Sequence, residues 1–185
     1  MRLHPSLLIL GYSEATEFLR DSARANLEAI IAIHSQHDHA LATDSVPYQL
    51  VLEFDDCEVQ SRSDILNAAR TRLRQRHAEQ FSLQLVLPTI EHAKAIINFA
   101  QSIREIEGTL LCQCQGGISR SPAAALLCLA AWTDPGWEDY CVRQVLAVRP
   151  CAVPHPDIVA FGDEILQRKG KLVEALERAE TSPTG

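Results

Sequence analysis

A thiol, two adjacent glycines and a guanidinium lie within the short segment Leu110–Pro122. Apolar residues lead up to Cys114, Gly116 and Gly117 follow it, and Arg120 stands just before a second apolar run. This order predicts a strand, a loop and a helix. Amides at a helix N-terminus carry partial positive charge and unpaired N–H groups, and glycines let the loop turn its amides inward. The segment therefore predicts an anion-binding site.

The residue at each end of this loop adds chemistry to the anion site. Cys114, at its start, is a candidate nucleophile because a helix N-terminus and a nearby guanidinium both favour a thiolate. Arg120, at its end, carries a planar fork that matches two oxygens of a phosphate. We expect Ser121 to cap the helix and Pro122 to take its first position. Together these groups predict covalent phosphoryl transfer, with phosphate bound by Gln115, Gly116, Gly117, Ile118, Ser119 and Arg120.

The segment from Cys114 to Arg120 matches the Cys-x5-Arg loop, or P-loop, of the cysteine-dependent protein tyrosine and dual-specificity phosphatases. Ser121 stands in the usual place after the arginine. Three other segments resemble small bacterial members of that superfamily, and they are Phe54-Asp55-Asp56, Pro88-Thr89-Ile90-Glu91-His92 and Arg149-Pro150-Cys151-Ala152-Val153-Pro154. The resemblance extends from about Leu50 to Leu176, and the P-loop is its most specific part.

The resemblance implies a two-step hydrolysis of a phosphoric monoester. Cys114 attacks phosphorus, an aspartic acid protonates the leaving oxygen, and water then hydrolyses the cysteinyl phosphate. Ser121 helps to release Cys114 from that intermediate. The resemblance implies no metal and no cofactor, because Arg120 and the loop amides supply the positive charge. The implied substrate is a phosphorylated protein or a small phosphoester.

Gln113 departs from the family pattern, which has histidine immediately before the nucleophile. That histidine organises hydrogen bonds around the thiolate, so its replacement bears on rate and not on the phosphate cradle. A phosphate-binding pseudophosphatase therefore stays open as an alternative. A phosphatase for small metabolites such as inositol phosphates is another, although the loop interior carries no lysine.

Two aspartates are candidates for the acid, because Asp55 and Asp56 directly follow a predicted strand. Parallel α/β folds bind ligands at the carboxyl ends of their strands, so these residues and Cys114 are expected at one edge of the sheet. Neighbouring side chains point in different directions, and the family's segment favours Asp56 over Asp55. The sequence alone leaves the choice open.

Apolar runs at 6–11, 29–33, 49–54 and 108–112 predict strands. Helical spacing predicts helices at 14–24 with Ser13 as N-cap, 62–80, 90–106 after Thr89, 122–132, 137–148, and 157–178 with a break at Gly170. This alternation indicates an α/β domain with a mostly parallel sheet of about four to five strands, flanked by helices. We expect one domain over residues 1–180 and a flexible tail over 181–185.

The predicted helix over 62–80 carries four arginines at alternate positions, which are Arg70, Arg72, Arg74 and Arg76. They form either a solvated basic face or a surface that steers an anionic substrate. His34, His37 and His39 follow a predicted strand, where a polar loop is favoured over a metal site.

Composition limits the classes of function. The 185 residues are 46% hydrophobic and carry a formal net charge of −7, which disfavours binding to nucleic acid or anionic lipid. The apolar run Leu7–Leu10 is too short for a secretory signal, and the six cysteines lack CxxC spacing. We therefore expect a cytoplasmic, monomeric protein with reduced thiols.

Overall fold

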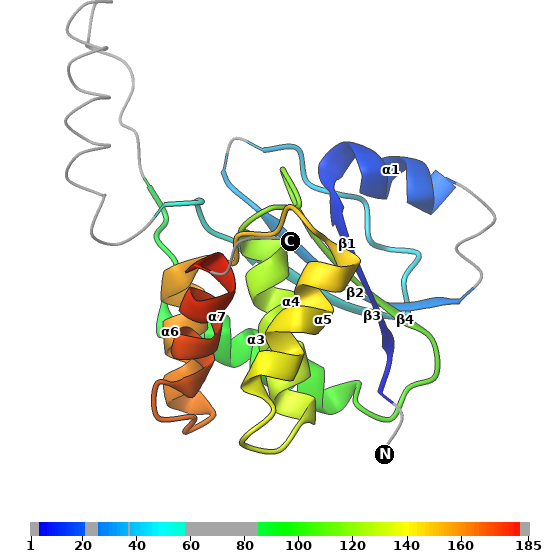
Figure 1. Ribbon diagram of the computed structural model, residues 1–185. Coiled ribbons are helices and arrows are strands. Elements are labelled where there is room, and N and C mark those ends of the chain that lie inside the picture. Colours follow the sequence, from blue (N-terminus) through cyan, green and yellow to red (C-terminus); the bar gives the residue numbers. More distant parts are fainter. Residues whose placement is uncertain (1–3, 21–25, 37, 58–84, 182–185) are drawn as a thin grey trace, which may run out of the picture.

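A parallel sheet forms the centre of the computed structural model, which describes residues 4–20, 26–36, 38–57 and 85–181. Its strands are β1 (Ser6–Gly11), β2 (Leu27–His34), β3 (Tyr48–Glu53) and β4 (Thr109–Cys114), in the order β1-β4-β2-β3 (Figure 1). Every pairing is parallel. The α/β fold expected from the sequence is therefore confirmed, and within the described ranges the sheet has four strands.

Helices cover both faces of this sheet. They are α1 (Tyr12–Arg20), α3 (Ile90–Ser102), α4 (Arg120–Trp132), α5 (Glu138–Val148), α6 (Pro156–Ile165) and α7 (Lys171–Thr181). Side chains alternate along β4, because Cys112 and Cys114 join the large core with α3 to α7 whereas Leu111 joins the smaller core under α1. No helix in the described part of the chain is long and apolar enough to cross a membrane.

The apolar helix α4 lies at the centre of the larger core, against α3, α5, α6 and the sheet. Almost all of its residues are buried, as a helix that is apolar all round requires. Gly162 of α6 lets the two helices approach closely, since a Cβ there would stand 2.5 Å from the Leu127 side chain. This packing holds the N-terminus of α4 directly behind the end of β4.

Several element boundaries differ from the sequence expectation. Helix α1 begins at Tyr12, so Ser13 lies inside it and is not its cap; the Glu14 carboxylate instead accepts a hydrogen bond from the Gly11 N–H at 2.7 Å. Thr89 does cap α3, where its N–H donates to His92 Nδ1 at 3.0 Å, but the helix ends at Ser102. The predicted helix over 62–80 and its four arginines lie outside the described residues.

The expected break near Gly170 separates α6 from α7. Gln167, Lys169 and Gly170 have positive φ angles there, and the Asp163 carboxylate accepts from the N–H groups of Gly170 at 2.6 Å and Leu172 at 2.8 Å. These bonds satisfy amides at the start of α7. Thr181 belongs to α7 and not to a tail, while residues 182–185 lie outside the described ranges.

Candidate active site

The P-loop (Cys114 to Arg120) joins the end of β4 to the start of α4. Helix α4 begins at Arg120, after Ser119, so Ser121 and Pro122 are its second and third residues. The expectation that Ser121 caps the helix is therefore wrong. Its Oγ instead donates to Cys114 Sγ at 3.1 Å, because the first turn of α4 passes directly over the end of β4. Pro122 takes the third position of the helix and not the expected first, but it remains in the first turn, where no intrahelical N–H bond is lost.

The outer wall of the P-loop is held by β1, α1 and Arg149. The Tyr12 N–H donates to Gln115 O at 3.1 Å. Gly117 has φ +66° and lies against Gly11, so that a Cβ on Gly117 would stand 2.6 Å from the Gly11 nitrogen. Only glycine fits this position without strain.

Arg149 binds the outward carbonyls of the P-loop. Its Nε donates to Gly117 O at 3.2 Å and its Nη1 to the Glu14 carboxylate at 2.9 Å. The pKa of Glu14 is held below its usual value. The hydrogen bond from the Arg149 side chain contributes most to this shift, and the hydrogen bond from the Gly11 N–H contributes next. Since a trans peptide directs its N–H away from its C=O, outward carbonyls favour inward amides. Glu14 was not anticipated from the sequence.

The Arg120 side chain is only 5% exposed, and hydrogen bonds to its Nη1 and Nη2 hold it in place. Its Nη1 donates to Ser35 Oγ at 2.9 Å and to Phe54 O at 3.0 Å, and its Nη2 lies 3.3 Å from Asp38 Oδ2. Nε is buried and has no hydrogen-bond partner among the described residues. The edge formed by Nε and Nη2 therefore retains an unused donor.

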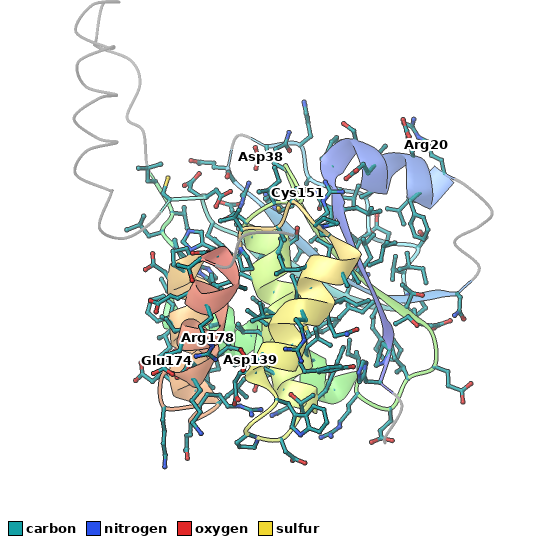
Figure 2. The ribbon with its side chains drawn as sticks, in the orientation of Figure 1. Arg20, Asp38, Asp139, Cys151, Glu174 and Arg178 are labelled. Atoms are coloured by element: carbon teal, nitrogen blue, oxygen red, sulfur yellow. The ribbon has the colours of Figure 1, made fainter. Side chains whose placement is uncertain are left out.

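Asp38 is a site residue that the sequence analysis missed. It follows β2 in a polar loop, and its carboxylate also accepts from the Ser35 N–H at 2.9 Å. Burial raises the pKa of Asp38, but the Ser35 N–H and the Arg120 guanidinium outweigh that effect and hold the pKa below its usual value. The loop after β2 thus places an ionised carboxylate beside Arg120 of the P-loop. Figure 2 labels Asp38 at this end of the molecule, near Cys151 of the loop between α5 and α6.

The two candidate acids have different partners. The Asp55 carboxylate accepts from the Val86 N–H at 2.7 Å, and the Asp55 N–H donates to Val86 O at 2.7 Å. The Asp56 Oδ1 accepts from Ser119 Oγ at 2.6 Å, and its Oδ2 lies 3.8 Å from Arg120 Nε. Asp56 is 43% exposed. The structure therefore brings Asp56 to the P-loop and engages Asp55 with the chain that leads to α3.

His155 is a second residue that the sequence analysis passed over. It precedes α6, its N–H donates to Ser119 O at 3.2 Å, and the neighbouring Val153 N–H donates to Ile118 O at 2.7 Å. Its side chain is 2% exposed, and Nε2 lies 3.9 Å from Asp56 Oδ1. In the sequence, His155 is distinguished only by its position between Pro154 and Pro156.

Gln113 is buried on β4, beside Leu10 of β1 and Ala32 of β2. Because side chains alternate along a strand, Gln113 leaves the face of the sheet opposite to that of Cys114. Its side chain therefore does not face the thiol.

Of the three candidate histidines, His34 ends β2 and His39 follows it in the next loop. His34 Nδ1 lies 3.2 Å from Ser35 O, and the His39 ring lies 6.1 Å from that of Tyr12. Within the described ranges, which omit His37, no group of three or more metal-ligating side chains is assembled.

Comparisons with known proteins place the fold. No family model matches the chain, and no curated protein matches its sequence. The crystal structure of DUSP15 matches at 23% identity with a TM-score of 0.55, covering 96% of this chain and 94% of that one. PTPMT1 in complex with PI(5)P matches at 13% identity and 0.53, covering 94% of both chains. Tk-PTP in its active form matches at 14% and 0.53, covering 90% and 93%.

These solved structures are dual-specificity or protein tyrosine phosphatases. The described part of the chain has their fold, and the three matches span nine tenths or more of the sequence. The fold expected from the P-loop resemblance is therefore confirmed.

Proposed function

We propose that this chain is a cysteine-dependent phosphoric monoester hydrolase of the protein tyrosine and dual-specificity phosphatase type. The observation that carries the proposal is the arrangement of Cys114 and Arg120 at the N-terminus of α4. Cys114 is 1% exposed and accepts a hydrogen bond from Ser121, while the buried Nε of Arg120 has no partner in the described part of the chain. An unpaired buried donor is costly, and a phosphate oxygen would satisfy it.

In the proposed reaction, Cys114 Sγ attacks phosphorus, so that an S–P bond forms as the ester P–O bond breaks. Asp56 gives its proton to the departing oxygen and becomes a carboxylate. Water then attacks the cysteinyl phosphate, Asp56 takes the proton from that water, and the S–P bond breaks. The Ser121 hydroxyl stabilises the departing thiolate. Arg120 and the loop amides balance the charge on the equatorial oxygens throughout.

We propose a phosphoprotein or another singly phosphorylated ligand as substrate. The loop interior from Gln115 to Ser119 carries no lysine, and a substrate with several phosphates would call for more positive charge there. A phosphorylated small molecule of the inositol phosphate class is the second candidate. The structural match to PTPMT1 in complex with PI(5)P favours that candidate.

We further propose a cytoplasmic monomer that acts without nucleic acid or membrane. The support is the formal net charge of −7 and the scattered cysteines, which are typical of a reducing compartment.

Turnover of 4-nitrophenyl phosphate by the wild type and by Cys114→Ser tests the mechanism. We expect Cys114→Ser to abolish turnover but to keep its affinity for tungstate, because Arg120 and the loop amides remain. Arg120→Lys should lose both, since an ammonium does not reproduce the planar fork.

The three proteins together separate the alternatives. Turnover by Cys114→Ser at the wild-type rate would overturn the covalent mechanism. A wild type that binds tungstate tightly through Arg120 but does not turn over any monoester would establish the pseudophosphatase alternative. Unchanged tungstate affinity in Arg120→Lys would exclude Arg120 as the phosphate clamp.

A further inference from the structure

The proposed reaction assigns no role to the imidazole of His155. This ring is 2% exposed, and neither Nδ1 nor Nε2 has a hydrogen-bond partner in the described ranges. Burying a polar group without a partner costs free energy, and such groups in native proteins call for an explanation. Leucine would fill the same space without that cost. We therefore expect that a hydrogen-bond partner approaches the His155 ring during the reaction.

The Asp56 carboxylate is the group that faces this ring. Its Oδ1 accepts from Ser119 Oγ at 2.6 Å and lies 3.9 Å from His155 Nε2. Its Oδ2 lies on the other side, 3.8 Å from Arg120 Nε. A shift of the carboxylate by about one ångström would turn the contact between Nε2 and Oδ1 into a hydrogen bond of ordinary length, about 2.9 Å.

The two residues around Oδ1 are joined to each other by a backbone hydrogen bond. His155 N–H donates to Ser119 O at 3.2 Å, so the imidazole and the Ser119 hydroxyl are tied together at the end of the P-loop. Asp56 comes from a different segment, after β3, and is 43% exposed. Asp56 is therefore the more exposed partner of this contact, and the proposal assigns to it the shift that would close the contact.

We propose that His155 is a positioning residue for Asp56, whose Oδ1 it holds together with Ser119 so that Oδ2 alone carries the catalytic proton. The proposal rests on the proposed function, because it assigns a seat to the acid of that reaction. In the first step the proton on Oδ2 passes to the ester oxygen as the P–O bond breaks and the S–P bond forms. In the second step Oδ2 takes a proton from water. His155 keeps its own Nε2 proton in both steps.

Other titratable or charged groups surround His155 and Asp56, and they also affect the pH dependence of kcat/KM. Those on the elements packed around His155 and Asp56 are Asp38, Asp55, Cys57, His92, Arg120 and Asp157. All of them are retained in the variants below. The basic limb of the pH–rate profile is the informative one, because it reports the loss of the proton donor.

Three substitutions separate a positioning role from a structural one. His155→Leu removes the donor and keeps most of the volume, whereas His155→Asn keeps an N–H donor on a shorter side chain. His4→Leu serves as the matched control, because His4 is a part-buried histidine that stacks on Trp132 before β1, at the opposite end of the sheet. Each protein is assayed with 4-nitrophenyl phosphate, a good leaving group, and with phenyl phosphate, a poor one.

We expect His155→Leu to lower kcat/KM for phenyl phosphate about tenfold more than for 4-nitrophenyl phosphate, which is part of the roughly 10²–10⁴-fold that general acid catalysis provides. Its basic limb should move to higher pH, because a lost donor disfavours the ionised carboxylate. His155→Asn should recover part of both effects. In an Asp56→Asn background His155→Leu should cause no further selective loss.

Equal losses on both substrates, with an unchanged basic limb, would overturn the proposal, and so would a selective loss that persists in the Asp56→Asn background. Tungstate affinity and the unfolding midpoint of each variant verify that the P-loop has folded.

Ring ¹⁵N NMR of His155 gives a test that does not depend on turnover, because its Nε2–H signal should shift in Asp56→Asn. A signal that does not shift would refute the contact even if the chain proved inactive, whereas inactivity alone would refute the proposed function.

Discussion

At the scale of single residues, the partners of two adjacent aspartates distinguish their roles. Asp55 accepts a hydrogen bond from the Val86 N–H, which secures the chain before α3. Asp56 faces Ser119 and Arg120 across the mouth of the P-loop. A general acid must reach the leaving oxygen, and of these two aspartates it is Asp56 whose Oδ2 lies near Arg120 Nε, at 3.8 Å.

Asp56→Asn should therefore lose activity steeply as the pKa of the leaving group rises, and it should lose the basic limb of the pH–rate profile. The reason is that an activated aryl phosphate departs without a proton whereas phenyl phosphate needs one. The expected loss on phenyl phosphate is roughly 10²–10⁴-fold. The measurement is kcat/KM for a series of aryl phosphates.

Asp55→Asn is the matched control for this series. Its loss should be modest and the same for every leaving group, because it weakens a bond to the backbone of Val86 and leaves Asp56 in place. A leaving-group dependence in Asp55→Asn, and not in Asp56→Asn, would reverse the two roles.

At the scale of elements, Arg168 joins the helices that surround α4. It lies between α6 and α7, pairs with Glu138 of α5 at 3.1 Å, and donates to the carbonyl oxygens of Ala130 and Thr133 at the end of α4. Both charged side chains are buried. Removing one partner of such a pair leaves a buried charge without compensation.

Arg168→Met should lower the free energy of unfolding by about 3–5 kcal/mol, measured by urea denaturation. Arg178→Met is the control, because Arg178 pairs with Asp139 at 2.9 Å and both side chains are exposed. Figure 2 labels these two residues beside Glu174. Exposed pairs contribute about 0–1 kcal/mol. Similar losses in the two variants would contradict the role assigned to burial.

At the scale of the whole molecule, titrating groups limit the pH range of stability from both sides. On the acid side, hydrogen bonds and arginines outweigh burial and hold the pKa values of Asp38 and Glu138 below their usual values. The unfolded chain then binds these protons first, so stability is complete above the unfolded pKa values, about 4, and falls as the pH drops through the folded ones.

On the alkaline side, burial raises the pKa of the Cys112 thiol well above its usual value, and burial also raises that of Cys141. The unfolded thiols ionise first, near pH 8.5, so stability is complete below that pH and is lost as the pH rises. We expect a plateau in urea unfolding between these limits. Cys112→Ala should make the alkaline decline shallower, and an unchanged slope would contradict this assignment.

Much of the site could be predicted from sequence because its central part is contiguous. A strand, a glycine loop and a helix start follow one another between Leu110 and Pro122, and short-range backbone rules govern all three. Short apolar runs likewise predicted the strands of the sheet, and a longer segment that is apolar all round predicted the buried helix α4. These features depend on neighbours in the chain, so no knowledge of the tertiary structure was needed.

The partners of the P-loop were decided only by the tertiary structure. Asp38 lies 82 residues from Arg120 in sequence, and Asp56 lies 63 residues from Ser119. They meet because the order β1-β4-β2-β3 brings the carboxyl ends of β2, β3 and β4 to one edge. His155 reaches the same place because α6 packs against α4. Sequence spacing carries no information on such contacts, since they arise from how strands are ordered and helices packed.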